Sequence, residues 1–203
     1  MTLNISHYTA ADYHELPWKN ETGSSTDLAI FPVGSTLVEP FHWRLSLSQI
    51  NGKVPFSKFP GYDRNIIQLK GKTITLLHAK HGEKLLGPLE IYAFKGGWET
   101  EVRLIGSAEV FNLMVRTEKL RAKIERVDIK DKKPLAKKLS RYTLLWIHQG
   151  TVDWECHGEK RVLKERDTLV IDSSEVLEYT MKSKRALIFV SNIEDITRSE
   201  AKI

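Results

Sequence analysis

Hydrophobic and polar residues alternate in short segments along much of this chain, and glycines separate the segments. The alternation is clearest where Phe41, Trp43, Leu45 and Leu47 are apolar and the residues between them are polar. A period of two residues is typical of a strand with one apolar and one polar face. Further short strands are expected at residues 28–31, 66–69, 73–78, 89–94, 100–104 and 110–116. Many short strands between glycines predict an all-β fold, either a sandwich or a barrel.

The same plan occurs twice in the chain. The segment from Ile66 to Gly71 resembles the segment from Leu145 to Gly150, and an alternating strand follows each of them. Both copies then contain the residues His-Gly-Glu-Lys, at 81–84 and at 157–160. Two copies predict two similar β-units. Because charge rises and hydrophobicity falls over residues 128–140, we expect an N-terminal half of residues 1–127 and a C-terminal half of residues 128–203.

The composition is that of an ordinary globular protein. Of the 203 residues, 41% are hydrophobic and 28% are charged, which argues against long disordered segments. No apolar run approaches the roughly 20 residues of a membrane helix, and the first residues do not resemble a secretory signal. Cys156 is the single cysteine, so an internal disulfide is excluded. We therefore expect a cytoplasmic protein that does not associate with a membrane.

The formal net charge of +5 raises the question of nucleic-acid binding. Much of the excess lies between Lys130 and Arg141, a tract with no aromatic residue before Tyr142. Single-strand binders place aromatic residues among basic ones so that bases can stack, and duplex readers need a basic helix or ribbon. The tract is therefore interpreted as a solvated connector, and no nucleic-acid partner is predicted.

The sequence offers no set of residues typical of a metal site or a catalytic nucleophile. None of the seven histidines forms a His-x-His pair, and His78 and His81 are expected on a surface turn. No Gly-x-Ser-x-Gly motif is present. The carboxylates of Glu21, Asp27 and Asp63 are interpreted as solvated loop groups. We therefore predict no metal, no cofactor and no catalytic residue.

Permanent cations do occur beside amides and hydroxyls, in sharply patterned segments. These residues are Lys19, Asn20, Arg44, Ser46, Arg64, Asn112 and Arg116. Arginine presents a planar fork that suits a carboxylate, and serine and asparagine add orienting hydrogen bonds. The first six are the predicted ligand-binding residues for a small anionic metabolite. Two purely structural roles stay open, because Arg44 could pair with Asp63 or another acid and Lys19 and Asn20 could brace a loop.

Four sequence segments resemble the signatures of the HutD/Ves family of bacterial proteins. They are Pro17-Trp18-Lys19-Asn20, Trp43-Arg44-Leu45-Ser46, the segment from Phe56 to Arg64, and Phe111-Asn112-Leu113-Met114. The resemblance covers roughly the first 116 residues by motif. Two positions depart from the family pattern. Residues 21–25 replace a run of glycines, and Val110 stands where an acidic residue is usual.

The resemblance implies a bicupin, which is an all-β chain of two cupin-type barrel halves, and cupins often form homodimers. Members of the family accompany histidine-utilisation genes and are linked to sensing of urocanate or N-formylglutamate, whereas others are linked to stress responses. The favoured hypothesis is a non-catalytic bicupin that senses a small carboxylic acid. One alternative is a metal-independent isomerase or hydrolase with Asp63 or Glu21 as its base. Another is a stress-related protein-interaction module.

Overall fold

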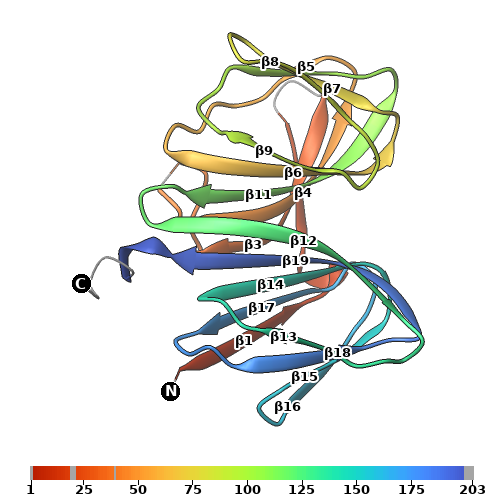
Figure 1. The fold of residues 1–203 in the computed structure, drawn as a ribbon. Coiled ribbons are helices and arrows are strands. Elements are labelled where there is room, and N and C mark those ends of the chain that lie inside the picture. The colour runs from red at the N-terminus through yellow and green to blue at the C-terminus, as the bar shows by residue number, and fades with distance from the viewer. Residues whose placement is uncertain (1, 19–21, 39, 199–203) are drawn as a thin grey trace. The chain divides into compact units, whose positions relative to one another are not determined.

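The computed structural model describes residues 2–18, 22–38 and 40–198, and these residues form β-strands with two short 3-10 helices. The strands belong to two compact units (Figure 1). The N-unit is Tyr13–Lys119, and the C-unit combines Met1–Asp12 with Leu120–Ile203. The 3-10 helices are η1 (Ala10–Asp12) and η2 (Ile196–Arg198). Among the described residues, no helix has the length and hydrophobicity that crossing a membrane requires.

The N-unit consists of two antiparallel sheets around one hydrophobic core. The first sheet has the order β2 (His14–Pro17), β3 (Gly23–Phe31), β4 (Trp43–Asn51), β11 (Ser107–Arg116), β6 (Tyr62–Gly71), β9 (Ile91–Lys95). The second has the order β5 (Val54–Pro55), β10 (Thr100–Arg103), β7 (Ile74–His78), β8 (Gly82–Leu86). Their core includes Ile50, Ile66, Leu76, Val102 and Val110, which come from both sheets. Each sheet therefore turns one face toward the other.

The C-unit has the same construction. Its larger sheet has the order β1 (Leu3–Tyr8), β17 (Thr168–Ser173), β14 (Tyr142–Gly150), β19 (Arg185–Asp195), β12 (Leu120–Lys130). The smaller sheet has the order β13 (Leu135–Lys138), β18 (Glu178–Lys182), β15 (Val152–Cys156), β16 (Glu159–Leu163). The core between them includes Ile147, Trp154, Leu169, Met181 and Ile188.

Strands β4 to β11 and strands β12 to β19 pair in one and the same pattern. In the N-unit β11 lies between β4 and β6, and β6 also pairs with β9; in the C-unit β19 lies between β12 and β14, and β14 also pairs with β17. The smaller sheets correspond strand by strand in the same way. The all-β bicupin fold expected from the sequence repeat and from the family resemblance is thus confirmed.

The division of the chain differs from the predicted boundary after residue 127. Strand β12 runs from Leu120 to Lys130 and pairs with β19 along its whole length, so the second unit begins before the charged tract. Strand β1 also belongs to this unit, because it pairs with β17 from Leu3↔Ser173 to Tyr8↔Thr168. A local change in composition carries no information about pairing over such a distance.

Both faces of β4 are buried, although its alternation is that of a strand with one polar face. Trp43, Leu45 and Leu47 alternate with Arg44 and Ser46, and each of the five is at most 5% exposed. The polar residues share the face of Ile50, which belongs to the N-unit core. The polar face of this strand therefore points into the unit.

Candidate ligand-binding site

Three neighbouring strands bring predicted site residues together inside the N-unit. Arg44 on β4 lies in register with Met114 on β11, and Met114 lies in register with Arg64 on β6. In the next row, Ser46 pairs with Asn112. All of these residues share their strand faces with core residues such as Ile50, Val110 and Ile66, because side chains alternate along a strand. Arg44, Ser46, Arg64 and Asn112 thus occupy adjoining positions in the interior.

Arg64 is a buried cation that lies against aromatic rings. Its side chain is 5% exposed, and its guanidinium carbon lies 4.6 Å from the ring centre of Phe56 and 5.2 Å from that of Phe94. Such contacts stabilise a cation through the ring quadrupole. Within the described part of the chain, Arg64 makes no ion pair, and its Nε has no hydrogen-bond acceptor. Burial, and next the charge of Arg44, lower the pKa of Arg64 to about 9.

Arg44 has an acidic partner from the adjacent strand. Its Nε donates to Oδ1 of Asp27 at 2.8 Å, and its terminal nitrogen contacts the same oxygen. The interpretation of Asp27 as a solvated loop group is therefore wrong, because Asp27 lies on β3 in register with Ser46. Asp63, the partner first considered for Arg44, forms an ion pair with Lys95 instead, at 2.7 Å. Arg44 thus pairs with an acid other than Asp63, which is one of the structural roles left open for it.

Two polar atoms in the same region have unused hydrogen-bonding capacity. Ser46 is 1% exposed and Asn112 is 5% exposed, and neither Oγ of Ser46 nor Oδ1 of Asn112 has a partner among the described residues. Buried polar atoms are nearly always hydrogen-bonded in folded proteins. Together with Nε of Arg64, they give this interior three polar atoms without a hydrogen-bond partner among the described residues.

His78 is a member of this interior that the sequence interpretation placed on the surface. It is 4% exposed, its Nδ1 lies 2.8 Å from Oγ1 of Thr100, and its Nε2 lies 3.1 Å from the hydroxyl of Tyr92. Burial, followed by the charges of His81 and Arg64, lowers the pKa of His78. The signal was present in the sequence, since Ile74, Leu76 and His78 have the spacing of one strand face.

Of the remaining candidate residues, some are not described and Arg116 lies elsewhere. Lys19 and Asn20, like Glu21, lie outside the described residues. Their neighbour Trp18 packs against the N-unit core, and its Nε1 donates to Oγ of Ser25 at 2.8 Å. Arg116 pairs with Glu118 and lines a different cleft, with Phe41, Phe59 and Tyr62.

The chemistry available in the cluster is that of binding an anion. It contains two guanidinium groups and one carboxylate, with donors and acceptors from Ser46, Asn112, Thr100 and Tyr92. In the described ranges, no three His, Cys, Asp or Glu side chains converge as a metal site. The neutral surroundings of Arg64 are aromatic, so the region also suits a planar group.

Comparisons with known proteins agree with the motifs. The profile of the HutD family matches residues 10–189. An uncharacterised 21.2 kDa protein from the hutC 3′ region of Pseudomonas putida is 34% identical over 120 residues, which are 59% of this chain and 62% of that protein. The match thus spans less than two thirds of that relative.

Solved structures extend the agreement to nearly the whole chain. A conserved protein of unknown function from Pseudomonas aeruginosa PAO1 is 25% identical, with a TM-score of 0.86 and coverage of 94% and 99% of the two chains. HutD from Pseudomonas fluorescens SBW25, in a formate condition, is 28% identical, with a TM-score of 0.78 and coverage of 95% and 99%. A cupin 2 conserved barrel protein from Leptotrichia buccalis shares only the fold, at 8% identity and a TM-score of 0.58, over 85% and 89%. Because the profile match extends over most of its length, this chain belongs to the HutD family.

Proposed function

We propose that this chain is a non-catalytic bicupin that senses a small carboxylic acid in the control of histidine utilisation. The observation that carries the proposal is the guanidinium of Arg64, which is buried among aromatic rings without a described acidic partner. An unpaired buried charge is strongly unfavourable unless a counter-charge reaches it. A carboxylate ligand would supply that charge and satisfy the guanidinium fork.

The neighbouring groups favour an acid with further polar atoms and a planar part. Ser46 and Asn112 carry the unpaired oxygens nearest in register, so they would orient the ligand through its own donors. The rings of Phe56 and Phe94 already contact the planar guanidinium of Arg64. A conjugated ring of the ligand would stack beside them. Urocanate and N-formylglutamate are the candidates that the family resemblance implies, and both are small carboxylic acids.

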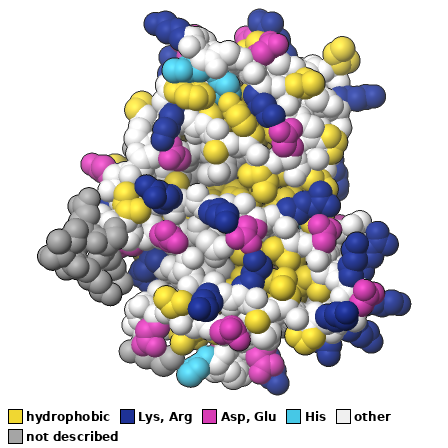
Figure 2. All heavy atoms as spheres, in the orientation of Figure 1, with side chains coloured by type: hydrophobic (Ala, Val, Ile, Leu, Met, Phe, Trp, Pro, Cys, Tyr) yellow, Lys and Arg dark blue, Asp and Glu magenta, His cyan; other side chains and the backbone are white. Residues whose placement is uncertain are grey.

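The alternative functions have weaker support. The hypothesis of an isomerase or hydrolase with Asp63 as its base is less well supported, because the carboxylate of Asp63 is paired with Lys95. Figure 2 shows acidic and basic side chains interspersed over the visible face, a pattern that favours a small ligand over a nucleic-acid partner. The single buried Cys156 is in keeping with a reducing, cytoplasmic setting.

Thermal denaturation with a panel of small acids tests the proposal. We expect urocanate or N-formylglutamate to raise the melting temperature, whereas the corresponding amides have no effect because they lack the charge. At 100 times the dissociation constant, binding stabilises the folded protein by about 2.7 kcal/mol, which is roughly 5 to 10 °C for a chain of this length.

Matched variants separate the site from the rest of the surface. Arg64→Met should remove the response, while Arg103→Met, which deletes an exposed guanidinium on β10, should keep it. Asp27→Asn should strengthen the response because it frees Arg44 from its internal carboxylate. A folded Arg64→Met protein that responds like the parent would show that the ligand site lies elsewhere.

A further inference from the structure

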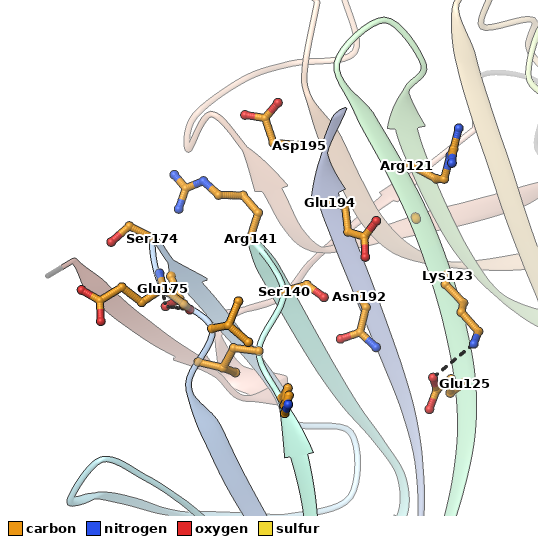
Figure 3. A pocket seen from close by; sticks show the side chains of 15 residues that line it. Arg121, Lys123, Glu125, Ser140, Arg141, Ser174, Glu175, Asn192, Glu194 and Asp195 are labelled. Carbon is orange, nitrogen blue, oxygen red and sulfur yellow. Dashed lines mark hydrogen bonds and ion pairs between the residues drawn. The ribbon is translucent and has the colours of Figure 1, made fainter. Parts of the chain in front are cut away.

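The C-unit has an open cleft of its own, with a volume of about 650 Å³ (Figure 3). This volume lies within the usual range of small-molecule sites. Strands β12 and β19 form one wall, and the opposite wall comes from Arg141 and from the segments around Ser140 and Ser174. The cleft is made entirely of C-unit residues, and the proposal about it is independent of the function proposed for the N-unit.

Three charged residues of this cleft, Arg121, Lys123 and Glu194, stand on the core-facing sides of their strands. Val127 and Ile129 of β12 belong to the C-unit core, so alternation places Arg121 and Lys123 on the same face. Along β19 the core residues Ile188 and Val190 are followed on that face by Asn192 and Glu194. The two strands thus continue from an apolar core into a polar mouth, where the barrel opens.

Two opposite charges stand side by side on neighbouring strands of this wall and do not pair with each other. Arg121 is directly in register with Glu194, and Lys123 with Asn192. Neither Arg121 nor Glu194 forms an ion pair or hydrogen bond with any described residue, although opposite side chains on paired strands start only about 5 Å apart. In Figure 3 the two side chains point in different directions. Both charges are therefore available to a ligand.

A third group of the cleft, the side chain of Asn192, favours a ligand that carries a hydrogen-bond donor. Oδ1 of Asn192 is shielded from solvent and has no hydrogen-bond donor in the described part of the chain. It lies two residues from Glu194 on the same strand face. A donor group that enters the cleft could satisfy Asn192 and Glu194 together. Across the cleft, Arg141 is already held by Asp172, so it adds a fixed polar wall and no free charge.

We propose that this cleft is a second binding site, for a small zwitterion of the α-amino acid class. The carboxylate of the ligand pairs with the Arg121 fork, and its ammonium group donates to Glu194 and to Oδ1 of Asn192. An α-amino acid carries both charges on one carbon, which matches two opposite charges on neighbouring strands. A simple dicarboxylate would meet Glu194 unfavourably, and a diamine would meet Arg121 and Lys123.

Heteronuclear NMR of the full-length, 15N-labelled chain provides the test. The probes are L-glutamine, L-serine and L-leucine, whose uncharged side chains leave the α-groups as the only charges. The controls are glutaramate, which is glutamine without the ammonium group, and 4-aminobutyramide, which is glutamine without the carboxylate. We expect saturable shifts of the backbone amides of Arg121, Ser140 and Asn192 with an amino acid, and at least tenfold weaker binding of both controls.

Charge-neutralising variants localise the effect. Arg121→Gln and Glu194→Gln should each weaken binding at least tenfold, while the exposed controls Arg185→Gln and Glu165→Gln should leave it unchanged. The proposal is overturned if no amino acid causes saturable shifts in the cleft or if the shifts fall only within residues 13–119. It is also overturned if glutaramate binds as tightly as glutamine. Because the analogues are compared on the unmodified protein, the result does not depend on the folding of any variant.

Discussion

Burying the guanidinium of Arg64 has a free-energy cost that its neighbours offset only in part. Taking its guanidinium out of water costs several kcal/mol, and contacts with Phe56 and Phe94 return only part of that. Arg44, its neighbour in the same row, adds a like charge, and Asp27 offsets one of the two. Among the described residues, the cluster thus contains two guanidinium groups and one carboxylate. A bound carboxylate would stabilise this unit by completing the set.

The lowered pKa of Arg64 makes carboxylate affinity depend on pH in a defined direction. Near pH 9 the folded protein begins to release this proton, whereas an arginine in the unfolded chain keeps it. The free energy of unfolding should therefore rise with pH above about 9, and the affinity for a carboxylate should fall. We expect N-formylglutamate to bind roughly tenfold more weakly at about pH 10 than at about pH 8.

Isothermal titration calorimetry checks this expectation. Near pH 9, binding should take up protons, so the measured enthalpy should depend on the ionisation enthalpy of the buffer. Constant affinity through pH 10 with no proton uptake would contradict the assignment of Arg64 as the group that meets the carboxylate.

At the residue scale, the sequence predicted the cations of the site more reliably than the residues around them. Arg44 and Arg64 stand in short, distinctive segments, and both lie in the interior. Asp27 and His78 were misjudged because a carboxylate or a histidine near a turn is more often solvated. The ion pair of Asp27 depends on the pairing of β3 with β4, and the burial of His78 on the pairing of β7 with β10; the local pattern contains neither pairing. The binding role of the cluster stays a prediction.

At the scale of elements, two glycines hold equivalent places in the repeat. Gly71 ends β6 with a φ of 96°, and Gly150 ends β14 with a φ of 90°. A Cβ at Gly71 would lie 2.2 Å from the carbonyl oxygen of Ser107, and one at Gly150 would lie 2.3 Å from that of Arg185. Each glycine thus allows the strand to turn while a second strand passes close by. The sequence displayed this feature as the glycine at the end of each repeated segment.

We predict that Gly71→Ala destabilises the chain more than Gly106→Ala does. Both glycines have positive φ, but only Gly71 has backbone atoms in the space of a Cβ. Gly106→Ala should carry only the strain of its φ, about 1 to 2 kcal/mol, and Gly71→Ala the added displacement of β11. Urea denaturation measures both variants. Equal stabilities would mean that the close approach to Ser107 is relieved without strain.

Element boundaries were less predictable than element identities. The expected strand at residues 66–69 is the centre of β6, which runs from Tyr62 to Gly71, and the strand expected at 110–116 begins at Ser107. Polar ends such as Tyr62-Asp63-Arg64 carry no apolar periodicity, yet their backbones pair with β9 and β11. Hydrogen bonding to a neighbouring strand extends a strand beyond the residues that its side-chain pattern marks.

At the scale of the whole molecule, one strand pattern encloses two different interiors. The N-unit holds Arg44, Arg64 and His78 in its interior, whereas in the C-unit Arg121, Lys123 and Glu194 line an open cleft beyond the apolar core. The internal repeat predicted the shared fold of the two units. It could not predict this difference, because function depends on individual side chains placed on a common fold.

Strand β1 should stabilise a unit whose other residues begin more than a hundred positions later. Leu3 and Ile5 pack against the C-unit core, and β1 covers the edge of β17. We predict that deleting residues 1–8 lowers the melting temperature and speeds amide hydrogen exchange in Thr168–Ser173. Exchange in β6 serves as the control. Unchanged protection of β17 would mean that β1 contributes little to the unit.

The most direct test of the central claim is the 15Nε NMR signal of Arg64 during a titration with urocanate and N-formylglutamate. We expect one arginine Nε–H resonance, absent from Arg64→Met, to move to saturation because this donor gains a carboxylate acceptor. The resonances of exposed arginines such as Arg103 should not move. A thermal response to these acids with an unmoved Arg64 resonance would show that Arg64 does not bind the carboxylate.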